Sequence, residues 1–117
     1  MDNGPNITDE VTVLGTLGVT APVNGHVVVT GAFSAFFKVG VAFRCDIATT
    51  AAVNGASGFV QQVLAGDSFQ SVTLTEGFQV AAGTTTFFLA CQRTNSGQNA
   101  STVTDINLTA VYSPNRL

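Results

Sequence analysis

Apolar and polar residues alternate most regularly between Phe36 and Ala48. The odd positions hold large apolar side chains or a cysteine, while the even positions hold every charge of the segment, Lys38, Arg44 and Asp46. A strand repeats every two residues, whereas a helix would scatter these three charges over different sides. The pattern therefore predicts a long strand over residues 36–48, with one apolar face and one face that is mostly exposed to solvent.

Other runs rich in β-branched residues follow the same rule and are separated by Gly, Asn and Pro. They predict strands over residues 10–19, 26–35, 59–65, 69–75, 78–80, 84–94 and 102–112. A bulge is expected near Gly15, and turns are expected at Thr20–Gly25 and at Glu76-Gly77. Residues 1–8 are expected to form a loose N-terminal segment.

Two of these runs also indicate which face points inward. In residues 26–35 the larger apolar side chains share one parity, and the same holds for the last run: Val27, Val29 and Phe33 in the first, Ile106, Leu108, Ala110 and Tyr112 in the second. No stretch has a helical stripe, and no linker or internal repeat divides the chain. The sequence therefore predicts one domain over residues 1–117, an antiparallel β-sandwich of jelly-roll type with seven to eight or more strands.

Several predicted strands carry large apolar residues on both faces. Phe36 stands next to Phe37, Val28 lies between two valines, and Phe88 follows Phe87. Burying a phenylalanine side chain is worth roughly 1.5–3 kcal/mol, so these residues predict a contact surface between copies of the chain. The alternatives are that strand ends or loops cover them, or that the parity shifts at a bulge. Phe36, Phe88 and Val28 are the candidate interface residues.

The chain contains two cysteines, Cys45 and Cys91, and both fall on the apolar parity of their predicted strands. Inward positions on neighbouring strands can come within reach of a disulfide. Free cysteines also behave as small buried hydrophobes, so two reduced thiols in the core are the alternative. The sequence leaves both possibilities open.

Composition excludes several classes of partner. Charged residues make up 9% of the chain, against roughly 25% in an average soluble domain. The net charge is −3 with four Lys and Arg residues in total, so no basic surface for nucleic acid or anionic lipid is expected. No run reaches the about eighteen apolar residues of a membrane span, and residues 1–5 lack the pattern of a secretory signal.

The residues that carry chemistry are few and scattered. His26 is the single histidine, and no Gly-x-Ser-x-Gly motif accompanies it, so neither a nucleophile–base pair nor a zinc site is expected. The sequence predicts a protein that is not an enzyme and has no cofactor. A sugar- or calcium-binding domain, with its site in the loops around Asn54 and Asn95, is the alternative. The absence of Trp and the single tyrosine, Tyr112, speak against sugar binding.

Three segments occur in the order expected of a known group of domains. They are Pro22–Val29, Val80–Leu89 and Leu108–Tyr112, and they resemble the Pro-x-x-Gly-x-Val, Val-x-Ala-Gly-Thr-x-Thr and closing Leu-Thr-Ala segments of small bacterial and phage jelly-roll domains. Those domains are similar to the complement-globular-head and tumour-necrosis-factor group. The resemblance implies a non-enzymatic domain that forms compact trimers, although the chain lacks the collagen-like or coiled stalk of receptor heads.

The sequence thus predicts a non-catalytic structural or adhesive module that associates with itself, as a trimer if the resemblance holds. It would decorate a larger assembly such as a virion or a cell surface, and would therefore be extracellular or on the virion. Its further partners would be a capsid or tail protein, a cell-surface protein or a glycan.

Overall fold

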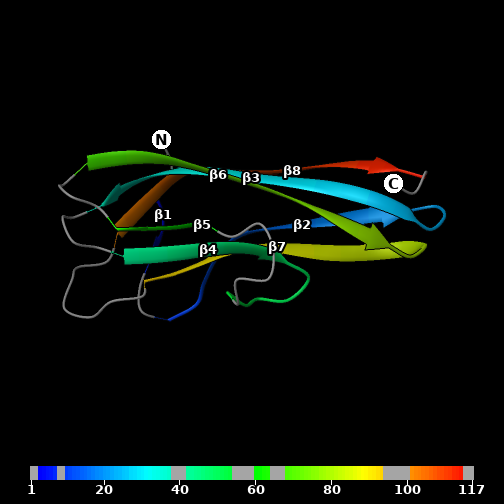
Figure 1. The fold of residues 1–117 in the computed structure, drawn as a ribbon, viewed down its shortest axis with the longest axis horizontal. Helices are drawn as coiled ribbons and strands as arrows, with labels where there is room; N and C mark the ends of the chain where they lie inside the picture. Colours follow the sequence, from blue (N-terminus) through cyan, green and yellow to red (C-terminus); the bar gives the residue numbers. More distant parts are fainter. Residues whose placement is uncertain are drawn as a thin grey trace.

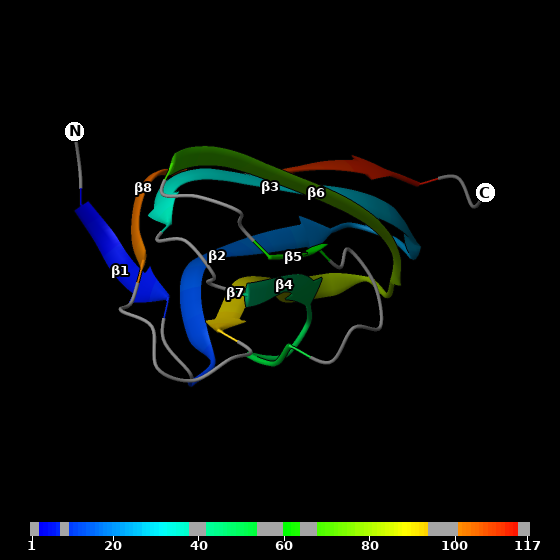
Figure 2. The same ribbon diagram turned by 60° about the vertical axis from the view of Figure 1, so that its left-hand side comes forward.

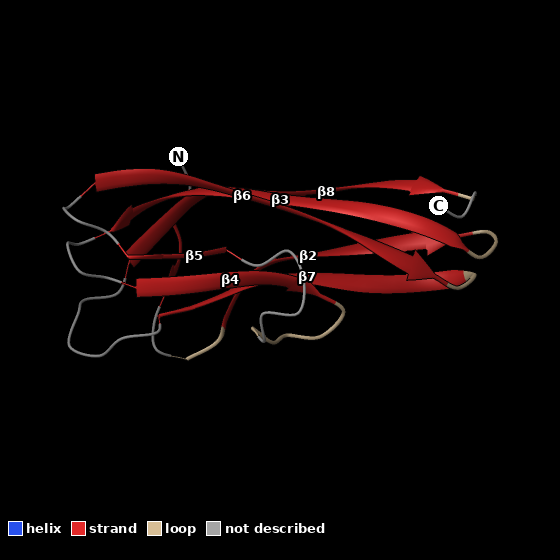
Figure 3. Cartoon of the chain, viewed as in Figure 1, coloured by secondary structure: helices blue, strands red, loops and turns tan. Residues whose placement is uncertain are grey.

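The structure, a computed structural model, describes residues 3–7, 10–37, 42–53, 60–63, 68–93 and 101–114. These residues contain eight strands and no helix (Figure 3). The strands are β1 (Asn3–Ile7), β2 (Thr12–Ala21), β3 (Gly25–Phe37), β4 (Ala42–Ala48), β5 (Val60–Val63), β6 (Ser68–Val80), β7 (Gly83–Arg93) and β8 (Ser101–Ser113).

The strands form two four-stranded antiparallel sheets that lie face to face (Figures 1 and 2). The first sheet has the order β1-β8-β3-β6, and the second sheet has the order β2-β7-β4-β5. The chain crosses from one sheet to the other at every connection except the one between β4 and β5. The prediction of an all-β fold with two antiparallel sheets is confirmed.

One hydrophobic core fills the space between the sheets. The inward faces of strands from both sheets contribute to it, as expected for two packed sheets. Phe43 of β4 and Phe87 of β7 are its largest fully buried side chains. The predicted inward residues of β3 are buried, and those of β8 are half-buried and pack against the core: Val27, Val29, Phe33, Ile106, Leu108, Ala110 and Tyr112.

The predicted strand over residues 36–48 is divided between the two sheets. Its first two residues, Phe36 and Phe37, complete β3 of the first sheet, and its last seven form β4 of the second sheet. Residues 38–41 lie outside the described part of the chain. The prediction of a single strand is wrong, because alternation reports which way each side chain faces and not where the chain changes sheets.

The prediction of a solvent-exposed face on this segment is also only partly correct. Asp46 has an exposed fraction of 0%, and its neighbour on β7, Ala90, is equally buried. Both residues lie on the outward parity of the second sheet, so the chain itself covers this part of the outer face. Coverage by distant segments leaves no trace in the alternation of a single strand.

The prediction of a loose N-terminal segment over residues 1–8 is wrong for the residues that the structure describes. Residues Asn3–Ile7 form β1, which pairs with β8 at the edge of the first sheet, and Ile7 is buried in the core. The register of the pair shifts between Asn3 and Asn6. Pro5 has no backbone N–H and masks the strand signal, but an edge strand tolerates proline.

The turn predicted at Glu76-Gly77 does not exist, and the runs over residues 69–75 and 78–80 form one strand, β6. Gly77 pairs with Val28 of β3, and a Cβ atom added to Gly77 would lie 2.9 Å from Nε2 of His26. The glycine thus makes room for the imidazole on the outer face. A glycine inside a strand marks such close approaches as well as turns.

Besides the shift between β1 and β8, two further irregularities interrupt the ladders. The bulge predicted near Gly15 is confirmed by a register shift between Val13 and Gly15. A second shift, between Ala32 and Ser34 of β3, accompanies a positive φ of 57° at Asp105 of β8. This bulge reverses the parity of β8, which is why Val103 and Ile106 both face the core.

Cys45 of β4 and Cys91 of β7 form a disulfide, one of the two alternatives left open by the sequence. The two residues face each other directly in the antiparallel ladder, with a Cα–Cα distance of 4.0 Å. Both are fully buried. The disulfide therefore links the two middle strands of the second sheet from inside the core.

Candidate interaction surfaces

The three candidate interface residues do not form one surface. Phe36 and Val28 lie on the outward parity of β3 in the first sheet, eight positions apart, while Phe88 lies on the outward parity of β7 in the second sheet. Each of the three is half-buried. Contacts made by Phe36 and by Phe88 would therefore be on opposite sides of the sandwich.

Phe36 contacts Phe69 of β6, an aromatic residue that is not among the three predicted interface residues. The two residues are register partners, and their ring centroids are 5.4 Å apart in an edge-to-face arrangement. Phe69 is 69% exposed. A sequence signal existed, because Phe69 shares its parity with the outward-facing Ser71 and Thr73 of the same strand.

A second apolar pair lies near the opposite end of the same outer face. Val28 of β3 is the register partner of Val111 of β8, which is 71% exposed. A sequence signal existed for Val111 as well, because it lies between Ala110 and Tyr112, whose side chains were predicted to face inward. Its own side chain is therefore on the outward parity of the strand.

Between the two apolar pairs, the outer face of the first sheet is mostly polar, and it includes the exposed carboxylate of Asp105 in the β8 bulge. Thr30 of β3 has Thr75 and Thr109 as its partners on the two neighbouring strands. The hydroxyl oxygens of Thr30 and Thr75 are 3.3 Å apart and share a hydrogen bond. This face offers hydroxyl groups flanked by apolar side chains, a surface suited to contact with another protein surface.

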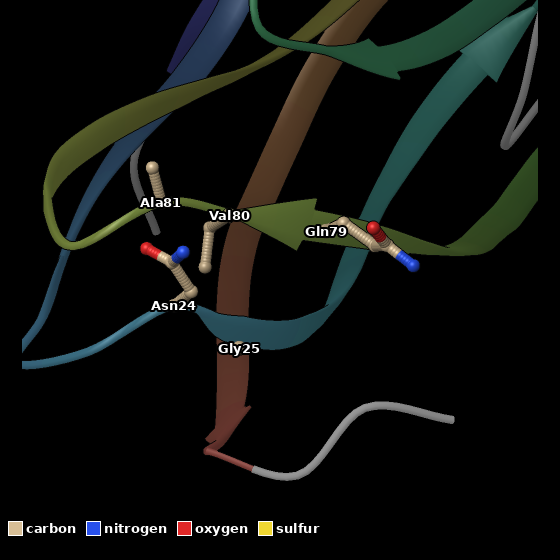
Figure 4. Close-up of a pocket in the computed structure, with 5 residues that line it drawn as sticks. All are labelled: Asn24, Gly25, Gln79, Val80 and Ala81. Atoms are coloured by element: carbon tan, nitrogen blue, oxygen red, sulfur yellow. The ribbon is translucent and has the colours of Figure 1, made fainter.

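A small pocket with a volume of about 240 Å³ lies at the end of the sandwich where the β2–β3 and β6–β7 turns meet (Figure 4). Its lining residues are Asn24, Gly25, Gln79, Val80 and Ala81. The Oδ1 atom of Asn24 accepts a hydrogen bond of 2.9 Å from the Ala82 backbone N–H. The lining contains no ionisable side chain, and it therefore offers no side chain for acid–base chemistry.

A further hydrogen bond connects this end of the sandwich to the last strand. The hydroxyl group of Tyr112 donates to the backbone carbonyl of Val23, at 2.8 Å. Together with the Asn24 contact, it holds the β2–β3 turn against both β8 and the β6–β7 turn. The side chains around the pocket thus fix the shape of the turns.

Within the described residues, no group of three or more His, Cys, Asp or Glu side chains lies close enough together to hold a metal ion. His26 is half-buried against Gly77. The loops around Asn54 and Asn95, proposed from the sequence for sugar or calcium, lie outside the described residues. No helix in the described part is long and apolar enough to span a membrane.

Comparison of the chain with models of protein families, with curated proteins and with solved structures finds no match.

Proposed function

We propose that this protein is a non-catalytic structural or adhesive module that associates with itself and decorates a larger assembly such as a virion or a cell surface. The observation that carries the proposal is the outer face of the first sheet. It exposes Phe69 and Val111 by 69% and 71%, at the two ends of a mostly polar surface. Covering a phenylalanine side chain contributes roughly 1.5–3 kcal/mol, so exposed residues of this kind favour contact with another surface.

We further propose that the sandwich is a jelly roll. In a jelly roll, two four-stranded sheets are built from eight strands by Greek-key connections. The strand orders β1-β8-β3-β6 and β2-β7-β4-β5 support this assignment, since the first and last strands are neighbours in one sheet and the two middle strands, β4 and β5, are neighbours in the other. The resemblance of Pro22–Val29, Val80–Leu89 and Leu108–Tyr112 to small bacterial and phage jelly-roll domains points the same way.

The trimer is the oligomer that this resemblance implies. Phe36 and Val28 contribute to the proposed contact surface together with Phe69 and Val111. Phe88 belongs to a second surface, on the other sheet, and a closed ring of three copies can use two different surfaces of each copy. The self-association is one proposal, and the number of copies is a separate one.

Size-exclusion chromatography with light scattering tests the self-association. At micromolar concentration we expect a mass that is a multiple of the 12.0 kDa chain, and three copies if the resemblance is correct. A monomer of 12.0 kDa over the whole concentration range would contradict the proposed function.

A further inference from the structure

The four edge strands of the two sheets differ in how well they are protected against pairing with another strand. An open sheet edge presents a row of N–H and C=O groups, and proteins protect such edges by shortness, proline, bulges or charge. Edge strand β5 has four residues, β1 contains Pro5 and a register shift, and β2 contains the shift near Gly15. Edge strand β6 is not short, and it contains neither a proline nor a register shift.

Strand β6 is long and regular. All thirteen of its residues, Ser68–Val80, pair with β3 in an unbroken register, and within the described part of the chain no other strand pairs with β6. Its single charged residue, Glu76, lies in the second half on the inward parity, where a charge disfavours the addition of a strand. The first half, residues 68–75, contains no charge, glycine or proline.

The unprotected half of β6 also carries the exposed aromatic residue. Phe69 is the second residue of the strand, and its register partner Phe36 covers it from the β3 side only. A strand added along the edge of β6 would cover Phe69 from the opposite side. The exposed apolar area and the open edge are therefore one continuous surface.

We propose that residues 68–75 of β6 pair in an antiparallel manner with the same residues of a second copy of this chain. A two-fold axis perpendicular to the sheet keeps outward residues outward, so Ser71 and Thr73 meet hydroxyl-bearing residues, and Val72 and Leu74 continue the apolar face. The two first sheets then form one sheet of eight strands.

A second copy fits this edge for two physical reasons. An antiparallel strand edge is complementary to itself, since each N–H of one copy meets a C=O of the other. The segment is also uncharged, so no like charges meet although the chain carries a net charge of −3. The inference depends on the proposed self-association and specifies the strand that mediates it. A two-fold contact joins copies in pairs, so it requires an even number of copies, such as a dimer or two joined trimers, and an isolated trimer would contradict it.

The test introduces lysine into the edge. Ser71→Lys with Thr73→Lys places two charges on exposed, outward positions of β6, where the monomer accommodates them. The matched control is Thr49→Lys with Thr50→Lys, which adds the same charge to exposed positions after the end of β4, outside both sheets. Circular dichroism and urea unfolding verify that both variants are folded.

We expect the edge variant to raise the dissociation constant at least about tenfold, measured by sedimentation equilibrium, while the control changes it by less than about threefold. An edge variant that associates like the unmodified chain overturns the inference and leaves the proposed self-association intact. Equal losses in both variants also overturn it, because they indicate that the added positive charge weakens association wherever it is placed. A strictly monomeric unmodified chain overturns both proposals.

Amide hydrogen exchange supplies a second measurement, which does not depend on any substitution. With increasing concentration of the unmodified chain, we expect slower exchange in residues 68–75 and unchanged exchange in β2, the edge strand of the other sheet. Association without added protection in residues 68–75 would contradict edge pairing.

Discussion

At the scale of single residues, the glycines within strands have different neighbours and therefore different importance. A Cβ atom added to Gly25 would overlap the backbone carbonyl oxygen of Ser113 and lie 2.9 Å from Cε1 of Tyr112. A Cβ atom added to Gly77 would meet only the imidazole of His26, at 2.9 and 3.0 Å. Backbone cannot move without breaking the β3–β8 ladder, whereas a half-exposed imidazole can rotate.

We therefore expect Gly25→Ala to lower the free energy of unfolding by about 1–3 kcal/mol, the usual cost of overpacking. Gly77→Ala should change it by less than about 1 kcal/mol, since the higher strand preference of alanine offsets the movement of His26. Urea unfolding of both variants checks the comparison. Equal destabilisation by the two substitutions would show that His26 is held as rigidly as the backbone.

The side-chain hydrogen bonds of the β2–β3 turn lead to a second prediction. Tyr112→Phe removes the bond to the Val23 carbonyl and should lower the free energy of unfolding by about 0.5–1.5 kcal/mol. Asn24→Ala, which removes the bond to the Ala82 N–H, should have an effect of similar size. Asn107→Ala, an exposed site away from the turn, is the control and should change stability by less than about 0.5 kcal/mol.

At the scale of elements, the disulfide joins β4 to β7 across a sequence separation of 46 residues. Closing a loop of this length restricts the unfolded chain by about 4 kcal/mol in the chain-entropy treatment, and measured effects are typically 2–4 kcal/mol. The bond is fully buried, so a reductant reaches it only when the second sheet opens.

We expect Cys45→Ala with Cys91→Ala to lower the free energy of unfolding by about 2–4 kcal/mol, measured by urea unfolding. The unmodified chain should react slowly with a reductant in buffer and rapidly in denaturant, and the double variant should not respond to reductant at all. Unchanged stability in the double variant would mean that the bond constrains the unfolded chain less than its separation implies.

The alternation of apolar and polar residues reports which way each side chain of a strand faces, and this determines which features of the fold could be predicted from the sequence. Strands β2, β3, β7 and β8, which are rich in β-branched residues, were predicted to within a few residues of their observed bounds. Alternation did not show that the run at Phe36 changes sheets, nor that Gly77 lies inside a strand. Strand β1 was missed because its proline and glycine hide a short edge strand whose partner, β8, is about 100 residues away in the sequence.

At the scale of the whole molecule, exposed apolar residues are found on both outer faces, but they are unequal. The first sheet exposes Phe69 strongly, whereas Phe88 on the second sheet is half-buried. The sequence indicated that both faces carry apolar residues, and it identified Phe36, Phe88 and Val28. It could not show that these residues lie far apart, nor that Phe69 and Val111 complete two pairs, because pairing between strands sets those positions.

Because Phe69 is more exposed than Phe88, we expect the outer face of the first sheet to carry the self-association. Phe69→Ser should raise the dissociation constant about tenfold or more, which corresponds to the loss of roughly 1.5–3 kcal/mol of buried apolar surface. Phe88→Ser, the matched control on the second sheet, should change it by less than about threefold. Sedimentation equilibrium measures both. A stronger effect of Phe88→Ser would move the principal contact to the second sheet.

The position of β8 has a consequence for how the molecule is made. This strand occupies an interior place in the first sheet, between β1 and β3, although it is the last strand in the chain. During synthesis, β3 can pair with β6 before β8 is made, but β1 finds its neighbour in the sheet only after residues 101–113 have left the ribosome. Completion of that sheet is consequently a late event, governed by contacts between distant parts of the chain, which form slowly.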